Sequence, residues 1–248
     1  NFKWFAGLRG QSYRVQTYGG DIEKGQAEKN IKTLFELEQP KGFNAVDHTR
    51  YANGVRFALA YDSRPRTQEN DPHSGIFSDI HYEGMGTGTG SAYSFYRVTA
   101  TYRQYIEVIK DIVLAFRLQG QRTVGDAPFF EIAKITTMRE SADGLGGAYG
   151  IRGYNANQFV DRVMGVANGE IRAKVASKPW LGGMDFVLLG YYDVGRVAPT
   201  TQEMTLKGLH QAVGGGLRLV WQTNTIVNIS YGKSQYSSYL TFSFGHMF

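Results

Sequence analysis

Hydrophobic and polar residues alternate along the last ten residues of the chain. Over residues 240–245, the even positions are large and apolar and the odd positions are small, and residue 248 is again large and apolar. The apolar positions are Leu240, Phe242, Phe244 and Phe248, and the small ones are Thr241, Ser243 and Gly245. A period of two is that of a β-strand, whose successive side chains point to opposite faces. So large an apolar face is unfavourable on a soluble edge strand but suits a strand that faces lipid.

The same alternation recurs along the chain between polar, glycine-containing turns. The predicted strands are residues 2–14, 55–62, 75–83, 96–105, 112–119, 129–136, 163–175, 185–197, 212–221, 226–233 and 239–248. An antiparallel barrel usually has an even number of strands, so one more is expected from residues 31–37 or from the uncertain N-terminal region. The predicted fold is all-β: a transmembrane antiparallel β-barrel of about 12 strands, within a range of about 8 to 16.

A soluble β-sandwich is the alternative fold, but its apolar faces would have to point inward. Composition favours the barrel, because the chain has 31 glycines, 14% aromatic residues and only 6 prolines. No apolar run reaches the roughly 18 residues that a transmembrane helix needs. The length of 248 residues fits a single outer-membrane β-barrel domain over residues 1–248.

The net charge is +5, and the basic residues recur singly at alternate strand positions. This spacing is typical of barrel-lumen or loop residues, so no nucleic-acid partner is expected. Cysteine is absent, which excludes disulfides and suits an oxidising periplasm. The chain begins at Asn1, which indicates a mature or excised form.

Two segments interrupt the alternation. Residues 19–50 are long, polar and charged, and they predict a surface loop or a short helix. Residues 138–162 are rich in glycine and too long for a simple turn. Long loops of this kind tend to be functional or disordered.

The second segment contains Gly146-Gly147-Ala148-Tyr149-Gly150-Ile151-Arg152-Gly153-Tyr154. Here the chain resembles the superfamily of BamA, TamA and two-partner-secretion transporters (bacterial surface antigens), whose barrels carry a Gly-Gly…Arg-Gly-Phe/Tyr motif on a loop folded into the lumen. Further blocks resemble the family's in the same order. They are Tyr61-Asp62-Ser63-Arg64 with Pro72 and Gly75, Glu170-Ile171-Arg172, Tyr192-Asp193-Val194-Gly195, residues 214–219 and the terminal Phe248.

The resemblance implies a latch in which Arg152 binds acidic residues of the barrel wall. The alternation places Glu170 and Asp193 on the polar faces of their strands, which point into the lumen. A partly desolvated guanidinium is costly alone and strongly bound when a carboxylate holds it. Gly153 would allow close approach of the backbone, and Tyr154 would pack on the wall. Phe248 resembles the C-terminal assembly signal of bacterial outer-membrane barrels.

The chain also departs from the family. It has no room for a periplasmic POTRA module besides a barrel, and about four strands of the usual barrel are missing. We therefore expect a shortened member or an excised fragment, integral to the bacterial outer membrane.

The expected function is non-catalytic: the chain handles protein or lipid through local bilayer disturbance. The alternative is a structural or pore-forming barrel, such as a homo-oligomer that organises lipid. Expected partners are outer-membrane lipid, outer-membrane protein clients and further copies of the chain. Neither an enzyme nor a cofactor is expected. The histidines lack metal-ligand spacing, so no metal is expected; they are His48, His73, His81, His210 and His246.

Overall fold

The computed structural model describes residues 1–14, 49–68, 70–138, 141–222, 225–245 and 248. Its main feature is one antiparallel sheet of 10 strands in the order β1-β4-β5-β6-β7-β10-β11-β12-β13-β14. The strands are β1 (Phe2–Arg9), β4 (Gly54–Asp62), β5 (Gly75–Met85), β6 (Phe95–Ile109), β7 (Ile112–Gly125), β10 (Val163–Lys178), β11 (Met184–Ala198), β12 (His210–Trp221), β13 (Thr225–Ser234) and β14 (Ser238–Phe244). The predicted all-β antiparallel fold is confirmed.

The remaining elements are short. β2 (Ser12–Tyr13) pairs with β3 (Arg50–Tyr51), and β8 (Lys134–Thr136) pairs with β9 (Ser141–Asp143). The helical turns are η1 (Arg66–Gln68), η2 (Thr87–Thr89), α2 (Phe129–Ile132) and η3 (Pro179–Leu181). No described helix is long and apolar enough to cross a membrane.

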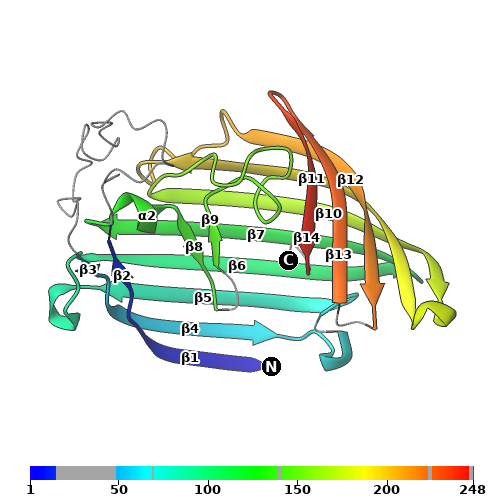
Figure 1. The fold of residues 1–248 in the computed structure, drawn as a ribbon, viewed down its shortest axis with the longest axis horizontal. Helices are drawn as coiled ribbons and strands as arrows, with labels where there is room; N and C mark the ends of the chain where they lie inside the picture. Colours follow the sequence, from blue (N-terminus) through cyan, green and yellow to red (C-terminus); the bar gives the residue numbers. More distant parts are fainter. Residues whose placement is uncertain (15–48, 69, 139–140, 223–224, 246–247) are drawn as a thin grey trace, which may run out of the picture.

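The sheet curls so that β13 and β14, in orange and red, run across the direction of β4–β7 (Figure 1). Within the described residues, no register joins β1 to β14, so this part of the chain forms a curled sheet with two free edges. The expected count of about 12 barrel strands therefore differs from the ten strands of the sheet. The additional strand suggested at residues 31–37 lies outside the described residues.

Two predicted strands take a different form. Residues 129–136 form helix α2 and the short strand β8 instead of a wall strand, because they lie inside the curl and have no neighbouring wall strand to pair with. The first predicted strand ends at Arg9, and β2 then pairs with β3 instead of continuing in the main sheet.

The two faces of the sheet have opposite chemistry, and the polar face is the buried one. Leu240, Phe242 and Phe244 point to the convex face and are 61–76% exposed. Arg97 and Glu83 point to the concave face and are fully buried. A soluble β-protein buries its apolar face. The observed inversion is that of a barrel with lipid outside and polar groups inside.

Candidate functional site: the loop latch inside the barrel

The connection from β7 to β10, residues 126–162, lies on the concave side of the sheet. We call it the internal segment. In Figure 1 its elements α2, β8 and β9 lie over β6 and β7. Hydrogen bonds fix this placement: the side chain of Gln121 on β7 donates to the carbonyl oxygen of Lys134 at 2.6 Å, and Arg97 on β6 donates to the same oxygen at 2.9 Å.

Arg152 is at the centre of the latch and is 4% exposed. Its guanidinium forms a bidentate ion pair with Asp193, with Nε–Oδ2 and Nη2–Oδ1 distances of 2.8 and 2.9 Å. Its remaining nitrogen, Nη1, lies 2.7 Å from Oε2 of Glu170. The backbone N–H of Arg152 also donates to Asp193 at 3.0 Å. Two carboxylates therefore bind one guanidinium, and Asp193 binds it in the bidentate geometry that is strongest for arginine.

The wall presents both carboxylates because β10 and β11 are neighbours. In their register Asn168 is opposite Asp193, and Glu170 is two residues further along the same face. The Asn168 amide donates to Asp193 at 2.8 Å and to the carbonyl oxygen of Gly150 at 2.9 Å. A wall residue thus ties the acceptor carboxylate to the loop that carries Arg152.

Glu170 also binds two wall arginines. Its Oε1 accepts from Arg172 at 2.7 Å and from Arg218 on β12 at 2.9 Å. Glu170 forms ion pairs with three guanidiniums. Because it is only 3% exposed, these ion pairs are almost completely shielded from solvent. Buried charges need such partners, since an unpaired one carries a large desolvation cost.

Gly153 allows the loop tip to approach the wall. Its φ is +103°, and an added Cβ would lie 3.1–3.2 Å from Gly232, Lys233 and Ala212. A side chain would therefore meet both backbone strain and close contact. Tyr154 is 2% exposed and packs edge-on against Phe159, with ring centroids 5.0 Å apart. The structure thus brings all five predicted latch residues together in one place.

A tyrosine missed in the sequence completes the site. The guanidinium carbon of Arg152 lies 3.4 Å from the ring centroid of Tyr191, a cation–π contact. An added Cβ on Gly214 would collide with the Tyr191 ring, so this glycine makes room for it. Tyr191 lies two residues before Asp193 on β11, so both side chains point to the concave face.

A family model for the Omp85 superfamily domain matches residues 9–245. The chain belongs to the Omp85 superfamily. It is an integral β-barrel protein of the bacterial outer membrane.

Among solved structures, the chain is similar to BamA from Haemophilus ducreyi lacking POTRA domains 1–3. The TM-score is 0.56 at 17% identity, and the match covers 79% of this chain and 42% of that one. The chain thus spans less than half the length of this BamA structure. No curated protein sequence matches it.

The block Tyr61-Asp62-Ser63-Arg64 with Pro72 and Gly75, which also resembles the family, lies at the connection from β4 to β5. Asp62 accepts from Nε of Arg64 at 3.0 Å and from Lys3 on β1 at 3.1 Å. Gly75 has a φ of +100°, and an added Cβ would lie 2.9–3.0 Å from the backbone of Arg64. This motif of the Omp85 chain therefore closes a turn and joins it to the edge strand β1.

A second charged cluster anchors the other end of the internal segment. We call it the Glu131 cluster. Glu131 on α2 is fully buried and pairs with Arg9 of β1 at 2.7 Å, with Lys134 at 3.0 Å and with Arg97 of β6. Glu83 of β5 joins through Arg97 at 2.8 Å and Arg9 at 3.0 Å. The sequence held one signal for it: an acidic residue inside the apolar run 129–132.

Phe248 does not share the outward face of β14, and this corrects the face predicted for it. Its side chain is 2% exposed and packs with Tyr105, Val113 and Ala115 on the concave side. Its ring centroid lies 5.4 Å from the guanidinium carbon of Arg117. The strand ends at Phe244, and Gly245 follows with a φ of +82°, so the alternation does not continue to the last residue.

Truncating this ring should cost stability. We expect Phe248→Ala to lower the free energy of unfolding by about 3–5 kcal/mol, the usual cost of removing a buried phenylalanine ring. Urea unfolding in detergent micelles measures it. Phe244→Ala is the matched control, because Phe244 points outward and is 76% exposed. Equal losses in the two variants would contradict the inward packing of Phe248. Its role as an assembly signal stays a prediction.

The described histidines, His73, His81 and His210, do not gather into a metal site. Within the described ranges, no group of three or more His, Cys, Asp or Glu residues is arranged to hold an ion. His48 and His246 lie outside those ranges.

Proposed function

We propose that this Omp85 chain handles protein or lipid at the outer membrane by physical means, at the free edges of β1 and β14. We call the region between these two edges the seam. The observation that carries the proposal is the shortness of the two edge strands. β14 has 7 residues and β1 has 8, whereas β6 and β10 have 15 and 16.

A transmembrane β-strand needs about 9–11 residues to cross the hydrocarbon core. The edge strands fall below that length and the central strands exceed it. A short wall is accommodated by local thinning of the bilayer at modest cost. The barrier to insertion would then be lowest beside the seam.

The edge strands can also pair with an incoming strand. An edge strand presents unpaired N–H and C=O groups, which bind an added strand by β-augmentation. The outward side chains of β1 are apolar, with Trp4 76% and Leu8 88% exposed. Such an edge suits a client strand that is itself entering lipid.

The latch would serve this function by fixing the internal segment while the seam opens. The lumen beside β6, β7, β10 and β11 is occupied by that segment, which argues against a simple diffusion pore. A structural homo-oligomer that organises lipid is the second candidate, supported by the many apolar side chains on the convex face.

The experiment uses the absence of native cysteine. Trp4→Cys with Phe242→Cys places one outward thiol near the middle of each edge strand, and bismaleimides of graded length cross-link the pair. Liposomes with the protein receive a urea-unfolded small outer-membrane barrel, and its folded fraction is followed by heat-modifiability on gels. We expect faster client folding than in empty liposomes, and loss of that gain after cross-linking.

Client folding no faster than in empty liposomes would overturn the handling proposal. Unchanged activity after cross-linking, or no cross-link at any spacer length, would overturn the seam. Native mass spectrometry separates the second candidate: a monomer near 27.7 kDa plus lipid favours the seam, and a discrete multimer favours the oligomer.

A further inference from the structure

A groove of about 650 Å³ crosses the outer wall of the barrel on strands β5, β6, β7, β10 and β11. We call it the wall groove. Ala100, Gly120 and Gly165 lie side by side on three neighbouring strands, because Gly120 pairs with both others in the register. These small residues all point to the convex face. They leave a furrow in the convex face of the wall, which elsewhere carries large side chains.

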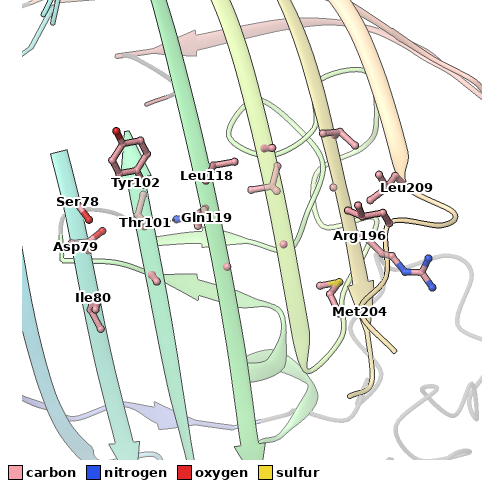
Figure 2. A pocket seen from close by; sticks show the side chains of 18 of the residues that line it. Ser78, Asp79, Ile80, Thr101, Tyr102, Leu118, Gln119, Arg196, Met204 and Leu209 are labelled. Carbon is pink, nitrogen blue, oxygen red and sulfur yellow. Dashed lines mark hydrogen bonds between the residues drawn. The ribbon is translucent and has the colours of Figure 1, made fainter. Parts of the chain in front are cut away.

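Large apolar residues border the furrow. Ile80 and Leu118 are 58% and 57% exposed and line the groove together with Tyr102 (Figure 2). The loop between β11 and β12 reaches over it at one end: an added Cβ on Gly165 would lie 3.4 Å from Cε of Met204. The groove is thus an apolar channel on the lipid-facing side, within the volume range of ligand sites, about 300–1,000 Å³.

Two arginines lie on the convex face toward the loop end of the groove, and one of them, Arg196, is a lining residue. Arg196 pairs with Gly165 in the register and lines the groove, with its side chain directed toward the loop in Figure 2. Arg122 follows Gly120 by two residues, so it points to the same face. Among the described residues, neither arginine forms an ion pair. Two cations beside an apolar furrow complement an anionic head group joined to a hydrocarbon tail.

We infer that the wall groove binds one anionic lipid, with an acyl chain over Ala100, Gly120 and Gly165 and the phosphate on Arg196 and Arg122. The inference rests on the outer-membrane location and not on client handling at the seam. Its test contains no client protein, so the two can fail separately.

The test measures lipid retained by the purified chain in native mass spectrometry, from micelles doped with equal phosphatidylglycerol and phosphatidylcholine. We expect one phosphatidylglycerol to be retained preferentially. Gly120→Leu should fill the furrow without backbone strain, because no atom lies closer than 4.0 Å to its added Cβ. Arg122→Gln with Arg196→Gln should remove the phosphate contacts. The arginine double variant should lower occupancy by about tenfold or more, the ratio given by one charge-assisted contact. Gly120→Leu should lower it as well, because the leucine occupies the space of the acyl chain.

Gly169→Leu is the matched control. It lies on the outer face of β10 beyond the groove, and its added Cβ meets nothing closer than 3.8 Å. It should retain the lipid, and heat-modifiability should show all variants folded. Equal retention of the two lipids by the unaltered chain would overturn the inference. So would a Gly120→Leu occupancy equal to that of Gly169→Leu, or an arginine double variant that keeps the preference.

Discussion

Arg152→Ala should release the tip of the internal segment and lower the free energy of unfolding by about 3–5 kcal/mol, the cost of breaking a buried ion pair. The alanine leaves Asp193 with the Asn168 amide and the backbone N–H of residue 152, and without a cation at hydrogen-bond distance. Glu170 keeps Arg172 and Arg218. The loss therefore arises mainly at Asp193, together with the stacking on Tyr191.

Two measurements check this expectation: urea unfolding followed by heat-modifiability, and chymotrypsin digestion at Tyr149, Tyr154 and Phe159. Cleavage of the folded barrel there should rise. Arg152→Lys keeps the charge but loses the bidentate geometry, so it should be intermediate. Arg66→Ala removes an exposed arginine from a turn and should change nothing. Unchanged unfolding and protease sensitivity in Arg152→Ala would refute the latch.

Glu131→Gln should weaken the other anchor by a similar amount, about 3–5 kcal/mol. The substitution keeps size and shape but removes the carboxylate that faces Arg9, Arg97 and Lys134. The remaining acid, Glu83, then has to balance Arg9, Arg56 and Arg97 by itself. Like charges in a buried site repel strongly, so α2 should detach from β6.

Chymotrypsin cleavage at Phe129 and Phe130 reports this change. It should increase in Glu131→Gln while cleavage at Tyr154 stays low. Glu107→Gln is the control, because Glu107 lies at the exposed end of β6. If both anchors give the same cleavage pattern, the internal segment is held as one unit and the two clusters are not independent.

Much of the wall could be predicted from the sequence, because a period of two fixes which side chains share a face. That parity alone placed Glu170 and Asp193 inside the lumen. It could not place Phe248, because the left-handed Gly245 ends the strand before it. Nor could it reveal the Glu131 cluster, since Arg9, Glu83 and Arg97 meet only when distant strands curl around α2.

The latch contacts themselves came from the resemblance and not from the period. Hydrophobic and polar residues do not alternate over residues 144–162. The path of the backbone there depends on the φ values of its glycines, such as +121° at Gly146, and the sequence does not specify these angles. Tyr191 illustrates the same limit. Its position along β11 gives the face to which its side chain points. Its contact with the Arg152 guanidinium depends on Gly214, which leaves space for the ring.

The positions of the two anchors along the chain have a consequence for the order of folding. The Glu131 cluster joins β1, β5 and β6 to α2, all of which precede residue 135. The latch joins Arg152 to strands that come later, β10 and β11. The N-terminal half can therefore bind the first part of the internal segment before β10 has paired with β7 and β11. Arg152 would then be available to pair with Asp193 and Glu170 when the C-terminal half folds. One long loop closure would be replaced by two shorter ones, which costs less entropy in each step.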